Sequence, residues 1–215
     1  MKNTPVQIVV IHDDIMFNPD NLVKSSPIMV ALVDKFGLDN VILFTHSQQG
    51  LDYVLENLGK KMVVLLDKNF YDGREKSGIQ VFEEIREQTS LVYVILTSVG
   101  KLTDIDEDSL KTLINNELFG FENFTSDYTK IVNLIERAVN KLNVRVDAVL
   151  EEWILRLDDS QREKPYIKLK DGTHYTLNDI VSEIRKESEF GIDMQRKILN
   201  LTIDLLTRQR TSLDD

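Results

Sequence analysis

Short apolar runs alternate with amphipathic segments over the first two thirds of the chain. Continuous apolar runs of this length are typical of strands that are buried on both faces of a parallel sheet. Four such runs span Val6 to Ile11, Val41 to Phe44, Met62 to Leu66 and Leu91 to Leu96, and a fifth, weaker strand is expected near Leu118 to Phe121.

The segments between these runs carry apolar residues at helical spacing. We expect helices over Pro27 to Phe36, Gln49 to Leu58 and Ile79 to Gln88, and another from about Ser126 to Leu142. Strands that alternate with helices predict an α/β fold, in which an open parallel sheet is covered by helices on both sides.

The C-terminal third has a different pattern. Apolar residues from Val146 to Leu157 fall at helical spacing, and Lys170 to Thr173 predicts a β-hairpin because its Asp-Gly pair suits a tight turn with positive φ. Two helices are expected after the hairpin, the last from Met194 to Arg208 with a broad apolar stripe. We therefore predict two domains, residues 1–143 and a helical module with a β-hairpin at residues 144–215.

The hairpin and its two helices, with roughly 50 residues, are too small to bury much apolar surface alone. We expect this module to pack on the first domain, on the helix that carries Trp153, or on a second copy of the chain. The apolar stripe of the last helix either completes a core or binds a partner, and a homodimer is one such arrangement.

Composition limits the function classes. The chain has 215 residues, of which 42% are hydrophobic and 29% charged, and no apolar run approaches the ~18 residues of a membrane span. The absence of cysteine excludes disulfides and thiolate metal sites. A net charge of -10 opposes binding to phosphate backbones, so nucleic acid is disfavoured as a partner. We expect a cytoplasmic protein that is not bound to membranes.

Acidic residues follow two of the predicted strands. Asp13 and Asp14 come after the first strand, and Asp67 follows the third. Because the carboxyl ends of neighbouring parallel strands meet at one edge of a sheet, these side chains are expected to converge. Carboxylate oxygens are the ligands that Mg²⁺ prefers, so this edge is a candidate magnesium site.

Further features occur in a fixed order along the chain. The acid pair is followed by Asp67, by a helix over Gly78 to Arg86 after a loop, and by Val94 to Ser98 at the end of the fourth strand. In this order and spacing, the segment from Val6 to about Leu142 resembles the receiver domain of bacterial two-component response regulators. The resemblance implies a flavodoxin-like, doubly wound, five-stranded parallel sheet.

The resemblance also implies roles for individual residues. Asp67 would accept a phosphoryl group from a sensor histidine kinase or another phosphodonor. Asp13, Asp14 and Asp67 would hold Mg²⁺ together with the backbone carbonyl of Asn69, and the hydroxyl of Thr97 would contact the phosphoryl group. Phosphorylation would then alter contacts of the C-terminal module or of a downstream protein partner. Such a protein is not a turnover enzyme.

The register of the acid pair stays open by one residue. His12 stands where receiver domains often have their first acid, so the pair is either Asp13 and Asp14 or His12 and Asp13. A histidine with no catalytic role at the end of the strand is the simpler interpretation of His12.

A lysine that usually ends the fifth strand of receiver domains is absent. Asn123 or Phe124 stands near its place, and Lys101 and Lys130 are candidates to replace it in space. The missing lysine supports a second hypothesis, in which the chain is a phosphorylation-independent pseudo-receiver that acts as a protein-interaction adaptor.

Two loops beside the predicted site are longer than is usual in the family. They span Ile15 to Ser26 and Asn69 to Lys76. Long ordered loops next to a site often determine partner specificity. Tyr71, Asp72 and Arg74 in the second loop are therefore predicted either to contact a partner or to lie in solvent.

Overall fold

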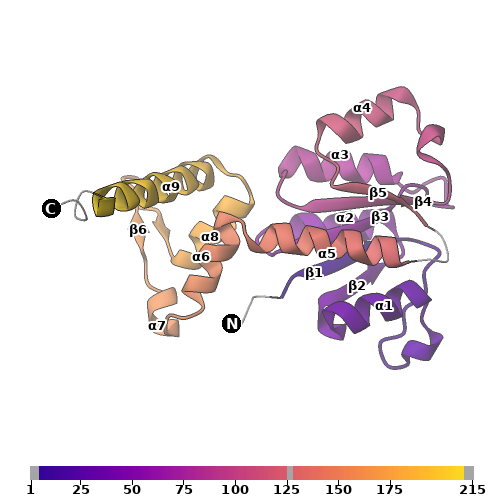
Figure 1. Cartoon of the computed structure of the whole chain (residues 1–215), viewed down its shortest axis with the longest axis horizontal. Helices are drawn as coiled ribbons and strands as arrows, with labels where there is room; N and C mark the ends of the chain where they lie inside the picture. The colour runs from indigo at the N-terminus through magenta and orange to yellow at the C-terminus, as the bar shows by residue number, and fades with distance from the viewer. Residues whose placement is uncertain (1–4, 125–127, 211–215) are drawn as a thin grey trace.

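A parallel five-stranded sheet forms the centre of the first part of the chain in the computed structural model, which describes residues 5–124 and 128–210 (Figure 1). Its strands are ordered β2-β1-β3-β4-β5. This is the flavodoxin-like order, so the predicted fold class is confirmed. The strands are β1 (Gln7–Ile11), β2 (Val41–Phe44), β3 (Met62–Asp67), β4 (Tyr93–Ser98) and β5 (Gly120–Asn123).

Helices cover both faces of this sheet. Alternate side chains of β1 point to opposite faces, so Ile8 and Val10 pack with α1 and α5, whereas Val9 and Ile11 pack with α2 and α3. The helices are α1 (Pro27–Phe36), α2 (Ser47–Glu56), α3 (Gly78–Gln88), α4 (Glu107–Asn115) and α5 (Thr129–Asn143). Short 3-10 helices span Leu22–Lys24 (η1), Leu38–Asn40 (η2) and Leu102–Asp104 (η3).

One helix of this part was not predicted, and one strand begins later than expected. The helix α4 was not predicted, because it is strongly charged and buries only Leu113; Asp106 caps it by accepting from the backbone N–H of Ser109. The strand β5 begins two residues later than expected, since Leu118 still bonds back to Leu113 at the end of α4. The predicted helix start at Ser126 lies outside the described residues.

The C-terminal part contains the predicted hairpin and helices. Its elements are α6 (Val146–Ile154), α7 (Asp159–Arg162), β6 (Ile167–Lys168), β7 (His174–Tyr175), α8 (Leu177–Arg185) and α9 (Glu189–Arg210). The hairpin turn contains Gly172 with φ +92°, as an Asp-Gly turn requires. These elements share a small core around Ile154, Ile180 and Ile184.

The last helix starts at Glu189, five residues before the expected start at Met194. The break between α8 and α9 lies at Glu187, whose φ is +52°. Gly191 lies within α9, where a Cβ atom would come 2.1 Å from the carbonyl oxygen of Glu183. Glycine is needed there because the two helices approach so closely.

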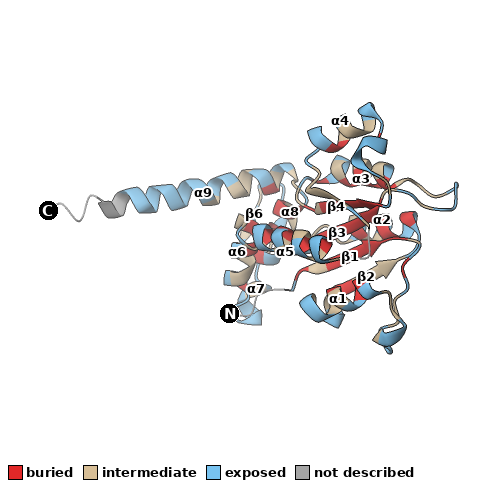
Figure 2. Ribbon diagram, turned by 45° about the vertical axis from the view of Figure 1, so that its right-hand side comes forward, coloured by how far each residue is buried: buried red, intermediate tan, exposed pale blue. Residues whose placement is uncertain are grey.

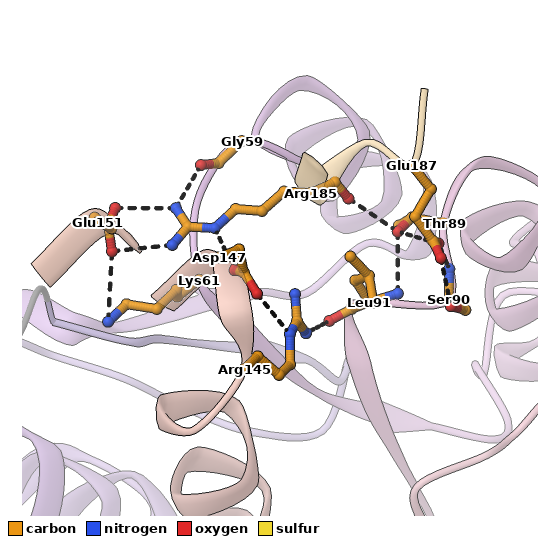
Figure 3. A network of polar contacts seen from close by, with 10 residues as sticks. All are labelled: Gly59, Lys61, Thr89, Ser90, Leu91, Arg145, Asp147, Glu151, Arg185 and Glu187. Carbon is orange, nitrogen blue, oxygen red and sulfur yellow. Dashed lines mark hydrogen bonds and ion pairs between the residues drawn. The ribbon is translucent and has the colours of Figure 1, made fainter. Parts of the chain in front are cut away.

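The C-terminal part is attached to the sheet through buried charges (Figure 3). Arg185, at the end of α8, donates to Asp147 at 2.8 Å, to Glu151 at 2.9 and 3.0 Å, and to the carbonyl oxygen of Gly59 at 2.9 Å. Lys61, just before β3, lies 3.5 Å from Glu151. Because Gly59 and Lys61 precede β3, the contact lies at the amino ends of the strands.

Two further contacts widen this attachment. Arg145 pairs with Asp147 at 2.9 Å and donates to the carbonyl oxygen of Leu91, just before β4. The carboxylate of Glu187 accepts from the hydroxyl groups of Ser90 at 2.9 Å and of Thr89 at 3.0 Å. Every residue that the sheet contributes here precedes a strand, so the C-terminal part lies at the sheet edge opposite to the carboxyl ends of the strands (Figure 1).

Candidate functional site

Asp67 ends the strand β3, whose residues are all buried. It pairs in register with Thr97 on β4. The helix α3 starts close behind it, because Gly78 donates its backbone N–H to the carbonyl oxygen of Lys68 at 2.9 Å. A Cβ atom on Gly78 would lie 2.0 Å from the carbonyl oxygen of Asp67, so only glycine allows this approach. The local packing thus fixes the backbone that carries the Asp67 carboxylate.

His12 and Asp13 reach the same place from the end of β1. The Nδ1 atom of His12 lies 3.9 Å from Oδ1 of Asp13 and 3.8 Å from Oδ2 of Asp67. One ligand atom from each of the three residues falls within 4.8 Å of the others, a spacing at which they could hold a metal ion. The predicted convergence of acids from the first and third strands is therefore seen for Asp13 and Asp67.

The Asp13 carboxylate uses only one of its oxygens. Oδ2 accepts the backbone N–H of Tyr71 at 2.6 Å. Oδ1 is buried and has no hydrogen-bond partner among the described residues. A buried carboxylate oxygen without a partner is costly, and a cation at this position would satisfy it. The donor set of this site thus fits a divalent cation that prefers oxygen ligands.

Asp14 lies at the mouth of the site and outside the three-residue group. Its backbone N–H donates to Nδ1 of His12 at 3.2 Å, and its side chain is exposed. Together with Asn69 it lines a pocket of about 230 Å³ above Asp67. The other lining residues are His12, Asp67, Phe70, Tyr71, Val99 and Phe124.

Burial shifts the pKa values of two side chains at this site, Asp67 and His12. Burial raises the pKa of Asp67 to about 6; the carboxylates of Asp13 and Asp14 act in the same direction, against backbone hydrogen bonds from Asn69 and Lys68. Burial lowers the pKa of His12, against the attraction of the same two carboxylates. The imidazole is therefore neutral at pH 7, which agrees with its Nδ1 accepting a hydrogen bond.

Thr97 is fully buried at the end of β4. Its hydroxyl donates to the carbonyl oxygen of Leu66 at 3.2 Å, and it is not among the residues that line the pocket. Its role as a phosphoryl contact stays a prediction, and it requires the hydroxyl to leave this partner.

Phe124 lies just after the end of β5, near the position where receiver domains usually have a lysine. Its backbone N–H donates to the carbonyl oxygen of Ser98 at 2.8 Å, which continues the pairing of β5 with β4. Its ring packs on the imidazole of His12 and lies 5.4 Å from the ring of Tyr128. Lys101 and Lys130 are exposed and do not line the pocket. The pocket wall on this side is therefore aromatic.

The loop from Asn69 to Lys76 is held at two points. Tyr71 bonds to Asp13, as described above, and the carboxylate of Glu75 accepts from the backbone N–H of Ser47 at 2.8 Å and lies 2.8 Å from Nδ1 of His46. Glu75 thereby caps the N-terminus of α2. The sequence prediction missed this contact, because a glutamate in a charged loop gives no signal of a distant helix end.

The residues of this loop that were predicted to contact a partner lie on the outside. Tyr71 is 84% exposed, and Asp72 and Arg74 form a salt bridge of 2.9 Å in solvent. The loop thus presents an aromatic ring and an ion pair beside the pocket.

No protein family profile matches this sequence, and no characterised protein matches it. Solved structures of similar fold are mostly receiver domains. A CheY-like receiver domain protein of Methanospirillum hungatei is 10% identical, with 65% of this chain and 98% of that chain covered and a TM-score of 0.48. A receiver domain protein of Clostridium thermocellum is 21% identical, with 63% and 95% covered and a TM-score of 0.46.

The response regulator DrrB of Thermotoga maritima, an OmpR/PhoB homolog, is 19% identical, with 64% of this chain covered and a TM-score of 0.45. The match spans 54% of that regulator, about half of its length. At such identities the likeness is one of fold. The strand order of the sheet is that of receiver domains, so the resemblance expected from the sequence is confirmed for the fold.

Proposed function

We propose that this chain is a response regulator-like signalling protein. A receiver-like domain, residues 1–143, accepts a phosphoryl group on Asp67 with the help of Mg²⁺. The change passes to a C-terminal interaction module, residues 144–215, or to a downstream protein partner. The observation that carries the proposal is the buried, unpartnered Oδ1 of Asp13 beside the buried carboxylate of Asp67 at the carboxyl edge of the sheet.

The reaction is a phosphoryl transfer. An oxygen of the Asp67 carboxylate bonds to phosphorus while the bond from phosphorus to the donor atom breaks, and the donor leaves with that electron pair. Donors of this class are a phosphohistidine of a sensor kinase or a small acyl phosphate. Asp13 and Asp67, with the carbonyl of Asn69, would hold Mg²⁺, which neutralises charge on the transferring group.

Protonation of Asp67 sets the lower pH limit of this reaction. Because the pKa of Asp67 is raised to about 6, most molecules carry the nucleophilic carboxylate at pH 7, but few do at pH 5. The protein turns over no substrate in this role. We place it in the cytoplasm, because its phosphodonors are cytoplasmic. None of the helices in residues 5–124 and 128–210 has the length and apolar character that a bilayer crossing requires.

Intact-mass spectrometry tests the proposal. The full chain is incubated with acetyl phosphate, with and without Mg²⁺, and compared with Asp67→Asn and with Asp72→Asn, an acid of the neighbouring loop that is outside the pocket. We expect one phosphoryl addition that requires Mg²⁺, persists in Asp72→Asn and disappears in Asp67→Asn. Absence of any addition, or an addition that persists in Asp67→Asn, contradicts it.

The second candidate is a phosphorylation-independent adaptor with a receiver fold. Two observations favour it: Phe124 lines the pocket where a cation is usual, and the Thr97 hydroxyl is bonded to Leu66. In this case the wild type takes up no phosphoryl group under any of the conditions above. Asp67→Asn then leaves binding to the downstream protein unchanged.

A further inference from the structure

The helix α9 leaves the body of the protein halfway along its length. Its first half packs on the C-terminal core through Phe190, Met194 and Ile198, and the ring of Phe190 stacks on Tyr175 at a centroid distance of 4.0 Å. The second half of the helix projects from the rest of the chain, and residues 199–207 are exposed (Figure 2). At 1.5 Å per residue, this projecting part is roughly 18 Å long.

The projecting part is apolar to an unusual degree. Its large apolar side chains are between 45% and 62% exposed: Leu199, Leu201, Ile203, Leu205 and Leu206. Single exposed apolar residues are common on protein surfaces, but several of them on successive turns of one projecting helix indicate a binding surface.

These residues form two stripes along the helix. At 100° per residue, Ile192, Leu199, Ile203 and Leu206 fall within about 60° of one another, with the seven-, four- and three-residue steps of a coiled-coil seam. Leu201 and Leu205 lie on another side and extend the line of Met194 and Ile198, which are packed in the C-terminal core. The first stripe, called here the free stripe, is not included in that core.

We propose that the free stripe packs against the free stripe of a second copy of this chain, with the two α9 helices antiparallel. In the register that places Leu199 opposite the partner's Ile203, this apolar pair occurs twice at the centre of the contact, and Leu206 lies opposite the partner's Arg196. The contact is then a two-fold, self-complementary interface of the kind that most homodimers use.

The charges of α9 favour a second copy of the chain as the partner and an antiparallel pairing of the two helices. Acidic residues, Glu189 and Asp193, lie in its first turns, and Arg208 and Arg210 lie at its end. In the antiparallel register Asp193 is level with Arg208 and Arg210 of the other copy, and the helix dipoles oppose each other favourably. A parallel pair would bring like charges level with each other.

The same segment also avoids the repulsion between two acidic chains. The whole chain carries a net charge of -10, yet the sequence of α9 holds four basic and three acidic residues. Two copies therefore meet at α9 without the repulsion that their overall charge imposes elsewhere. The close approach of Gly191 to Glu183 holds α9 against α8, so the projecting half is presented in a defined direction.

Sedimentation equilibrium of the full chain tests the dimer. We expect the wild type to dimerise at concentrations up to about 100 µM, and Leu199→Glu combined with Ile203→Glu to weaken the dimer at least about tenfold. Val23→Glu combined with Ile114→Glu, at apolar residues that are 95% and 73% exposed elsewhere, is the matched control and leaves it unchanged. A monomeric wild type, or a dimer that survives the α9 substitutions, overturns the proposal.

Disulfide trapping tests the direction of the helices, since the chain has no cysteine of its own. Arg196→Cys and Leu206→Cys are prepared separately and then mixed. An antiparallel pair places residue 196 opposite residue 206, so the disulfide forms between the two variants in the mixture and not within either variant alone. Self-cross-linking of each variant indicates a parallel pair and overturns the antiparallel arrangement.

Discussion

The imidazole of His12 packs on the ring of Phe124, with the ring centroids 4.5 Å apart and the ring planes inclined by 48°. Each residue stands near a place where receiver domains usually carry a charge, an acid in the first case and a lysine in the second. The pair replaces both charges with a neutral, aromatic contact. Changing each residue alone separates the effect of His12 from that of Phe124.

Replacing His12 by aspartate should strengthen binding of Mg²⁺. The neutral imidazole adds no negative charge to the site, whereas an aspartate would add a carboxylate oxygen near those of Asp13 and Asp67. We expect the Mg²⁺ dissociation constant to fall about tenfold, since one charge-assisted contact contributes ~1.5 to 3 kcal/mol. Isothermal titration of His12→Asp and of His174→Asp, an exposed histidine outside the site, measures this; equal affinities for wild type and His12→Asp would contradict it.

Replacing Phe124 by lysine should place a cation at the pocket wall. The ammonium would favour the charged form of Asp67 and lower its pKa from about 6. We therefore expect the pH at which acetyl phosphate labels half of the protein to shift downward. Lys130→Met serves as the control, because Lys130 lies outside the pocket, and its pH profile should match the wild type. An unchanged profile in Phe124→Lys would show that residue 124 does not reach the phosphoryl site.

Asp67 should make folding stability depend on pH. Its pKa is about 6 in the folded protein against an ordinary 3.8, so the folded state binds more protons between these values. The free energy of unfolding should therefore fall as the pH rises from 4 to 6, and Asp67→Asn should remove this fall. Without metal, we expect the variant to be more stable by about 1 to 2 kcal/mol at pH 7, allowing for partial solvent exposure, and equal to the wild type at pH 4.

Urea unfolding across this pH range, with and without Mg²⁺, measures the effect. Addition of Mg²⁺ should stabilise the wild type and leave Asp67→Asn nearly unchanged, because the ion binds the carboxylate. A wild type that is as stable as the variant at pH 7 would mean that the Asp67 charge is already compensated.

Arg185 should be essential to the attachment of the C-terminal part. It is 3% exposed and bonds to Asp147, which is 2% exposed, so Arg185→Met leaves this buried carboxylate with Arg145 alone. The substitution also removes the cation that Glu151 pairs with at 2.9 Å. Removing one partner of a buried pair typically costs ~3 to 5 kcal/mol. We expect a loss of that order in urea unfolding. Lys111→Met, which breaks exposed pairs on α4, is the control and should cost less than ~1 kcal/mol.

The parts of the fold that could be predicted are those that depend on short-range sequence patterns. The strands β1, β3 and β4 follow from continuous apolar runs, and the meeting of Asp13 with Asp67 follows from the rule that parallel strands end at one edge. The helix α4 was missed although Leu110, Leu113 and Ile114 fall at helical spacing, because it is short and Leu113 is its one buried residue among the described positions.

Long-range contacts could not be predicted. Arg185, Asp147, Glu151 and Lys61 look like ordinary surface charges on separate elements, yet the fold buries them together over a span of more than a hundred residues. The contact of His12 with Phe124 also joins two residues that are far apart in the sequence. The sequence placed Asn123 or Phe124 near the lysine position, but it could not show that the ring of Phe124 packs on His12.

The helix α5 runs between the two ends of the five-stranded sheet. Tyr128, at its start, lies beside Phe124 at the pocket, and Arg145, just after its end, bonds to Asp147 and Leu91 in the attachment of the C-terminal part. Fifteen helical residues, ~22 Å in length, lie between them. A displacement of the aromatic wall would thus be transmitted to the far edge of the sheet by a rigid-body movement of α5, without local unfolding between the two ends.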